Sequence, residues 1–242
     1  WKSEILRLQQ QIEARFGQPI SEAALRDAIV LKNRERQATA DFYRLGQLNP
    51  PALSGTDILK VVYGATFRFD KNALINELNE MTARIKTQWQ DGKRLDARPR
   101  ILITGCPIGG AAEKVVRAIE ENGGWVVGYE NCTGAKATER NVAEEGDVYD
   151  ALTDKYLAIG CSCISPNTER LRLLSQMVEE YQVDGVVDVI LQACHTYAVE
   201  SLSIKRHVRQ QHDIPYMAIE TDYSTSDIGQ LSTRVAAFIE ML

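Results

Sequence analysis

Short apolar runs alternate with amphipathic stretches throughout residues 99–242. Four of these runs have the length and the Val and Ile content of buried strands: residues 100–105, 125–129, 185–191 and 215–219. Because strands that alternate with helices form right-handed βαβ units, the pattern predicts a parallel sheet covered by helices on both faces. The predicted fold class is therefore α/β, with a doubly wound four-stranded parallel sheet.

The helices of this half are predicted from their capping residues and apolar spacing. Gly110 opens a helix to Glu121, and a long irregular stretch follows the second strand. Ser165 and Pro166 then match the cap and first position of a helix that runs to about Tyr181. Two further helices are expected, at residues 197–211 and 226–241.

Residues 1–98 carry apolar side chains at helical spacing and are predicted to be helical. Ser21 caps one helix, Ser54 or Thr56 caps another, and Asp70 opens a third. The charged side chains of this region are expected to form a solvated helix face. A polar segment before Pro99 marks a boundary, which divides the chain into a helical region, 1–98, and an α/β domain, 99–242.

Charge and hydropathy exclude two classes of function. The formal net charge is −5, which disfavours nucleic-acid binding. No apolar run reaches the roughly 18 to 20 residues of a membrane span, and no signal peptide is recognisable. The expected location is therefore the cytoplasm. Because the sequence begins at Trp1, we expect it to be a piece of a longer product.

The five cysteines all lie between residues 106 and 194, and three of them follow predicted strands. Cys106, Cys132 and Cys194 come directly after the first, second and third strands. Ligands of parallel sheets bind beyond the carboxyl ends of the strands, so these thiols are expected to converge. Cys161 and Cys163 precede a predicted helix N-terminus, whose dipole favours thiolates.

Three interpretations of the cysteines remain open. Their odd number, without an export signal, argues against a disulfide framework. One thiol per loop does not match the paired spacing of zinc fingers, whereas iron–sulfur sites tolerate dispersed ligands. An iron–sulfur site is favoured, but zinc or redox thiols and purely structural cysteines are the alternatives.

Other residues at the strand ends are candidates for binding and proton transfer. Gly105, Gly109 and Gly110 resemble a phosphate-binding loop, although tight turns for close packing explain them as well. His195 is a candidate proton donor, and Glu220 could handle protons with Asp222, unless Asp222 or Asp227 caps the last helix. His207 and His212 are expected to face solvent.

Several motifs together resemble the 2-hydroxyacyl-CoA dehydratase family, D-component type, and are most similar to its double-cubane cluster proteins. The motifs are Ile103-Thr104-Gly105-Cys106-Pro107-Ile108-Gly109-Gly110, Glu130-Asn131-Cys132-Thr133-Gly134, Gly160-Cys161-Ser162-Cys163, Leu191-Gln192-Ala193-Cys194-His195-Thr196-Tyr197 and Ile219-Glu220-Thr221-Asp222-Tyr223-Ser224. The resemblance extends over nearly the whole chain. It implies two stacked α/β domains with iron–sulfur clusters between them, and the upstream domain is missing from this chain.

The resemblance also implies the cofactor, the ligands and the partners. The cofactor is a [4Fe–4S] cluster or a double-cubane [8Fe–9S] cluster. The ligands are Cys194 first, then Cys132 and Cys163, followed by Cys161 and Cys106. An ATP-dependent activator protein delivers low-potential electrons, and the protein is expected to be a homodimer acting on a small molecule, without nucleic acid or membrane.

The leading hypothesis is an iron–sulfur redox enzyme, or enzyme subunit, that reduces a small substrate. The alternative within this class is radical dehydration of a 2-hydroxyacyl-CoA. A hypothesis of another class is a non-catalytic module that binds a phosphorylated ligand at Gly109 and Gly110.

Overall fold

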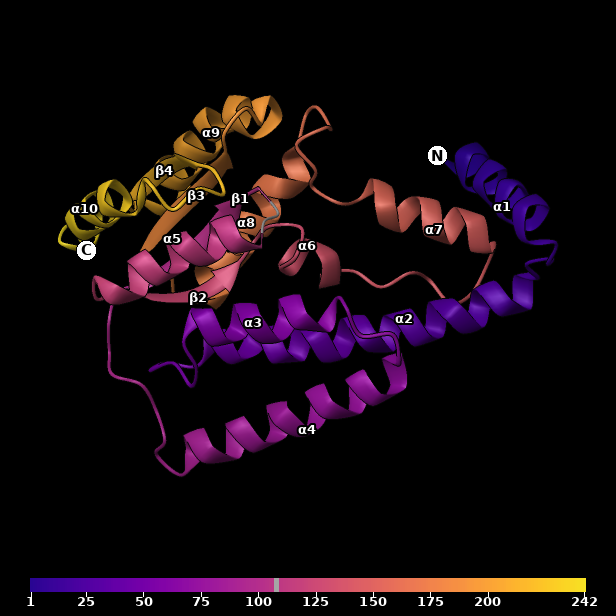
Figure 1. The fold of residues 1–242 in the computed structure, drawn as a ribbon, viewed down its shortest axis with the longest axis horizontal. Helices are drawn as coiled ribbons and strands as arrows, with labels where there is room; N and C mark the ends of the chain where they lie inside the picture. Colours follow the sequence, from indigo (N-terminus) through magenta and orange to yellow (C-terminus); the bar gives the residue numbers. More distant parts are fainter. Residues whose placement is uncertain (107–108) are drawn as a thin grey trace.

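The computed structural model describes residues 1–106 and 109–242, and its centre is a parallel sheet (Figure 1). The strands occupy the predicted positions: β1 (Arg100–Gly105), β2 (Trp125–Tyr129), β3 (Gly185–Leu191) and β4 (Tyr216–Thr221). Their order is β2-β1-β3-β4, and every neighbouring pair is parallel. The predicted fold class, a doubly wound four-stranded α/β sheet, is confirmed.

Helices cover both faces of this sheet because its strand residues alternate between two cores. On one face, Ile101 and Ile103 pack in a cluster with helices α5 (Gly110–Glu121), α10 (Ile228–Ile239) and α3 (Gly55–Ala65). On the other face, Leu102 packs with α8 (Thr168–Glu180) and α9 (His195–His207), which continues as the short π-helix η2 (Val208–His212).

The first 98 residues are helical, as predicted. They form α1 (Lys2–Phe16), α2 (Glu22–Tyr43), the 3₁₀ turn η1 (Arg44–Gln47), α3 and α4 (Lys71–Gln90). Ser21, Ser54 and Asp70 each cap a helix by accepting a backbone N–H. Phe42 and Ile58 from this region share one buried cluster with the sheet, so the helices pack directly on the α/β half.

Removing one of these caps is expected to have a measurable cost. The Ser54 side chain accepts a hydrogen bond from the Asp57 backbone N–H at 3.1 Å, and Ser54→Ala leaves that donor unpaired. We expect a loss of about 1 kcal/mol in the free energy of unfolding, measured by urea denaturation. Ser3→Ala is the control, because Ser3 lies inside α1 and does not cap it. Equal effects of the two substitutions would contradict the capping role.

Two predictions between β2 and β3 are wrong. The stretch predicted to be irregular contains α6 (Ala135–Thr138) and α7 (Val148–Leu157). Helix α7 forms because Asp147 caps it and because Val148 and Ala151 bury themselves against α2. The helix predicted to start at Ser165 begins at Thr168 instead. Asn167 takes the N-cap position, and its side chain donates to Glu200 Oε1 at 2.8 Å on α9.

No helix in the described ranges combines the length and the apolar character that crossing a bilayer requires.

Candidate functional site at the carboxyl edge of the sheet

The cysteines gather where the strands end. Cys106 follows β1, Cys132 follows β2 and Cys194 follows β3, while Cys161 and Cys163 lie in the loop before α8. All five are free thiols. Cys132 and Cys163 are exposed, Cys161 and Cys194 are half-buried, and Cys106 is buried. Four of the five thiols are therefore accessible at this edge of the molecule.

Cys194 occupies the N-cap position of α9, where backbone N–H groups are free to donate. Partial burial opposes its ionisation, but hydrogen bonds from the Tyr197 backbone and the Thr196 side chain outweigh it and lower the pKa of Cys194. The Thr196 hydroxyl oxygen lies 3.7 Å from the sulfur. Cys194 is thus held in surroundings that favour the thiolate, which is the form that binds metals.

The Cys161 and Cys163 thiols lie next to each other and close to Cys194. Cys161 raises the pKa of Cys163, mainly through a hydrogen bond between the two thiols, and Cys194 adds a smaller contribution. The Ser162 hydroxyl donates to Thr196 Oγ1 at 3.2 Å, which ties this loop to the start of α9. Within residues 1–106 and 109–242, however, no three Cys, His, Asp or Glu side chains surround one point closely enough for a single metal ion.

Cys106 differs from the other four cysteines. Its side chain is 3% exposed and belongs to the main hydrophobic cluster, and its sulfur accepts the Leu191 backbone N–H at 3.2 Å. Burial raises the pKa of Cys106 to about 12. These surroundings are typical of a packing cysteine, so the ligand role of Cys106 stays a prediction with less structural support than the others.

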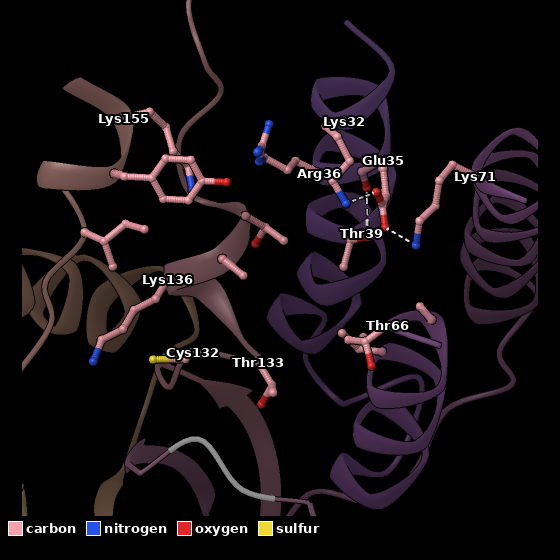
Figure 2. A pocket seen from close by; sticks show the side chains of 16 residues that line it. Lys32, Glu35, Arg36, Thr39, Thr66, Lys71, Cys132, Thr133, Lys136 and Lys155 are labelled. Atoms are coloured by element: carbon pink, nitrogen blue, oxygen red, sulfur yellow. Dashed lines mark hydrogen bonds and ion pairs between the residues drawn. The ribbon is translucent and has the colours of Figure 1, made fainter. Parts of the chain in front are cut away.

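Cys132 lies between a buried tyrosine and an open cavity. Its sulfur is 3.8 Å from the Tyr197 hydroxyl oxygen. Two cations flank the ring of Tyr197, with Lys136 Nζ 5.3 Å and the Arg170 guanidinium carbon 4.8 Å from the ring centre. On its other side, Cys132 lines a cavity of about 410 Å³ together with residues of α2, α3, α6 and α7 (Figure 2).

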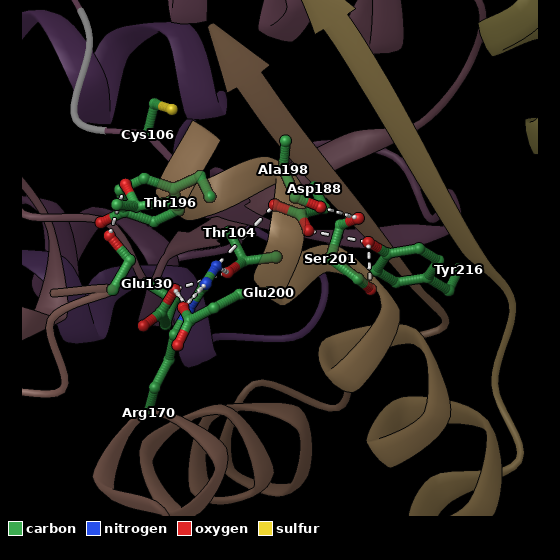
Figure 3. A network of polar contacts seen from close by, with 12 residues as sticks. Thr104, Cys106, Glu130, Arg170, Asp188, Thr196, Ala198, Glu200, Ser201 and Tyr216 are labelled. Atoms are coloured by element: carbon green, nitrogen blue, oxygen red, sulfur yellow. Dashed lines mark hydrogen bonds and ion pairs between the residues drawn. The ribbon is translucent and has the colours of Figure 1, made fainter. Parts of the chain in front are cut away.

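A buried charge network lies near the ends of the strands, close to Cys106 (Figure 3). Arg170 of α8 is fully buried and reaches acidic side chains from three different elements. Its guanidinium nitrogens are 2.5 Å from Glu200, 3.5 Å from Glu130 and 3.8 Å from Asp188. The same side chain donates to the Thr104 hydroxyl at 2.9 Å, and that hydroxyl donates to Glu130 at 2.5 Å.

This network joins the ends of β1, β2 and β3 to the helices that carry the cysteine loops. Lys136 of α6 adds a second cation, 3.0 Å from Glu130 Oε1, and both groups are buried. Tyr216 of β4 donates to Asp188 at 2.7 Å. Burial raises the pKa of Asp188, although Arg170 opposes this effect. The network therefore fixes the positions of the loops around Cys132 and Cys194.

The sequence interpretation did not identify Arg170, Lys136 or Glu200 as part of the site. Weak signals existed in two places: Glu130 lies inside one of the cysteine motifs, and Asp188 interrupts the most apolar run of the chain. Arg170 had no such signal, because an arginine in an amphipathic helix ordinarily faces solvent.

The glycines after β1 serve close packing in the structure. Gly105 has φ +110°, and a Cβ there would lie 2.1 Å from the Val189 carbonyl oxygen, so only glycine fits between β1 and β3. A Cβ at Gly109 would lie 2.8 Å from the Tyr63 hydroxyl. Gly110 begins α5. Phosphate binding by these three glycines stays a prediction, and Pro107 and Ile108 of the same motif lie outside the described residues.

The predicted proton-transfer residues are not brought together by any described contact. His195 is exposed beside Cys194 and lines a separate cavity of about 600 Å³. Glu220 is exposed on β4. Asp222 accepts the Ser224 backbone N–H at 2.7 Å.

Asp227 sits at the N-cap of α10, but its side chain binds Lys114 and Thr221 instead of capping. The prediction that His207 and His212 face solvent is wrong. Each ring lies within hydrogen-bond distance of the Ser175 hydroxyl, because η2 folds back against α8.

Comparisons with known proteins relate the chain to dehydratase subunits. The family model described as 2-hydroxyglutaryl-CoA dehydratase, D-component, matches residues 1–242. The "Putative dehydratase subunit YjiM" of Escherichia coli is 84% identical over 242 residues, which are all of this chain and 63% of that protein.

More distant relatives are dehydratase subunits with named substrates. The (R)-phenyllactyl-CoA dehydratase beta subunit of Clostridium sporogenes is 23% identical over 96% of this chain and 61% of its own length. The beta subunit of (R)-2-hydroxyglutaryl-CoA dehydratase from Acidaminococcus fermentans is 24% identical over the same shares. The chain thus spans less than two thirds of the length of the relatives it matches.

Proposed function

Because the chain belongs to the 2-hydroxyglutaryl-CoA dehydratase D-component family, we propose that it forms part of a dehydratase-type enzyme subunit that binds an iron–sulfur cluster. The observation that carries the proposal is the gathering of Cys132, Cys161, Cys163 and Cys194 at the carboxyl edge of the sheet. These four thiols come from three loops separated in the sequence, because Cys161 and Cys163 share one loop. All four are at least partly accessible in this structure.

The chemistry of the donor set fits such a cluster. Thiolates bind iron, and the lowered pKa of Cys194 favours this form. Hydrogen bonds to the sulfur atoms influence the potential of a cluster, and the Tyr197 hydroxyl and the Thr196 side chain lie next to two of these sulfurs. Cys106 fits less well, since its buried thiol resists ionisation. We assign Cys194, Cys132, Cys163 and Cys161 as ligands.

Dehydration of a 2-hydroxyacyl-CoA is the proposed reaction, in the cytoplasm and in a homodimer. The named relatives act on phenyllactyl-CoA, 2-hydroxyglutaryl-CoA and lactoyl-CoA, which share a hydroxyl group next to the thioester. When bound, the cluster supplies low-potential electrons that it receives from an ATP-dependent activator protein. His195, exposed at the start of α9 beside Cys194, is the proposed donor of a proton to the departing hydroxyl group.

Reduction of a small substrate by a double-cubane cluster is the second candidate, and the number of thiols favours it. A [4Fe–4S] cluster is held by about four thiolates. The four accessible cysteines of this chain already equal that number, before any ligand from the remaining length found in the relatives is added. Any further thiolate ligand would exceed the need of one cubane and would be available to a second.

Iron analysis of the full-length protein, purified without oxygen, tests the proposal. We expect about four irons per chain with an equal amount of sulfide for a single cubane, and about eight for the double cubane. Cys194→Ser is expected to lower the iron content several-fold. Cys106→Ala is the matched control and should retain the iron, because Cys106 is a core residue.

Iron-free wild-type protein would overturn the proposal and favour a module that binds a phosphorylated ligand. Equal iron loss in the Cys194 and Cys106 variants would contradict the ligand assignment.

A further inference from the structure

The cavity beside Cys132 is strongly basic. It lies between the long helix α2 and the segment that carries α6 and α7, and its volume is about 410 Å³ (Figure 2). Six of its lining residues are charged, and five of these are cations: Lys32, Arg36, Lys71, Lys136 and Lys155, against the single acid Glu35. Because the chain as a whole has a net charge of −5, this concentration of positive charge in one cavity calls for an explanation.

The carboxylates near the cavity neutralise only part of this charge. Glu35 accepts from Lys32 and is 3.1 Å from Lys71, so one carboxylate serves two lysines. Lys136 turns away from the cavity toward Glu130. Arg36 and Lys155 have no carboxylate partner in the part of the chain that the structure describes; Arg36 donates only to the neutral Asn33 side chain, at 2.9 Å.

These two unpaired cations are buried. Arg36 is 8% exposed and Lys155 is 7% exposed. Burial, reinforced by the charges of Arg36 and Lys32, lowers the pKa of Lys155 to about 8. The Lys155 ammonium lies 4.5 Å from the centre of the Tyr156 ring. A mostly buried cation without a counter-charge is costly, and a ligand in the cavity that supplied the opposite charge would reduce this cost.

We propose that this cavity binds a small organic molecule that carries at least two negative charges on carboxylate or phosphate groups. Arg36 supplies a planar pair of N–H donors suited to such oxyanions, and Lys155 supplies a compact positive charge opposite it. The volume admits a molecule considerably larger than a single inorganic anion. Since Cys132 lies on the wall, the bound anion lies beside the proposed cluster edge, although the site does not depend on a cluster.

Binding is tested on the full-length protein by isothermal titration calorimetry at constant ionic strength. Two probes distinguish the possible sources of charge: pyrophosphate represents phosphate groups, and tricarballylate represents carboxylates. We expect saturable binding of at least one probe, and at least a tenfold weaker affinity in Arg36→Gln and in Lys155→Gln. Lys86→Gln, an exposed substitution on α4 that does not line the cavity, should leave the affinity unchanged.

Each possible result supports or overturns the proposed anion site. Binding of one probe alone identifies phosphate or carboxylate as the preferred group, and binding of both supports the general anion site. The absence of saturable binding, or binding that survives both cavity substitutions, overturns the proposal. An equal loss in Lys86→Gln also overturns it, because the effect would then be non-specific. Iron content, measured on the same samples, separates failure of this site from failure of the proposed cluster.

Discussion

Replacing Arg170 with methionine is expected to lower the free energy of unfolding by about 3 to 5 kcal/mol. The guanidinium is fully buried and lies within 4 Å of three acidic side chains, Glu130, Asp188 and Glu200. Methionine fills similar space but provides no charge and no hydrogen-bond donor. Glu130 and Asp188 are fully buried as well. The substitution removes the counter-charge beside Asp188 and leaves Glu130 with Lys136 alone.

Urea denaturation at pH 7 measures this effect, with Arg172→Met as the matched control. Arg172 lies two residues away on the same helix, its side chain is 41% exposed, and its ion pairs are at the surface. We expect the control to change stability by no more than about 0.5 kcal/mol. If Arg170→Met were as mild as the control, the network would not be the element that holds the strand ends together.

Replacing Lys155 with methionine is expected to act in the opposite direction and to stabilise the ligand-free protein by roughly 2 to 3 kcal/mol at neutral pH. The folded protein holds the pKa of Lys155 at about 8, below its ordinary value of 10.5. The unfolded chain therefore binds the proton more tightly than the folded chain does. The charged lysine destabilises the fold fully below about pH 8, and this penalty disappears as the pH rises toward 10.5.

The difference in stability between Lys155→Met and wild type, measured from pH 6 to pH 10.5, tests this prediction. The difference should be largest at pH 6 to 7 and should shrink above pH 8. Lys155 faces Arg36 and Lys32 from α2, so their charges contribute to its depressed pKa. Lys60→Met, on the exposed side of α3, is the control and should show no such trend. A difference that is independent of pH would refute the electrostatic explanation.

Local patterns were sufficient for most of the fold. The four strands are apolar runs with β-branched residues, and the caps at Ser21, Ser54 and Asp70 act within three residues of their own position. Such signals depend on neighbours in the sequence, and the structure confirms them. The prediction failed at α7, because the burial of this helix depends on α2, more than a hundred residues earlier in the chain. It also failed at the start of α8, where the Asn167 side chain donates a hydrogen bond to Glu200 on α9.

The candidate site also has one part that the sequence predicts and another part that it does not. The cysteine loops were predictable because parallel strands all end at one edge of a sheet, so a thiol after each strand must arrive there. The burial of Cys106 was not predictable, since it depends on the backbone of β3 beside it. Nor was the basic cavity: the charged residues of α2 match a solvated helix face, and only the approach of α7 turns Arg36 into a buried cation.

By itself, the sequence determined the positions of the four strands and of most helices, the edge of the sheet where the thiols meet, and the family resemblance. The tertiary structure alone decided which charged side chains are buried together. Arg170 meets Glu130 and Asp188, and Lys155 meets Arg36, across long separations in the sequence. Hydrophobic periodicity records which face of an element is buried, whereas a buried charge is defined by its partner, and that partner is known only after the elements have packed.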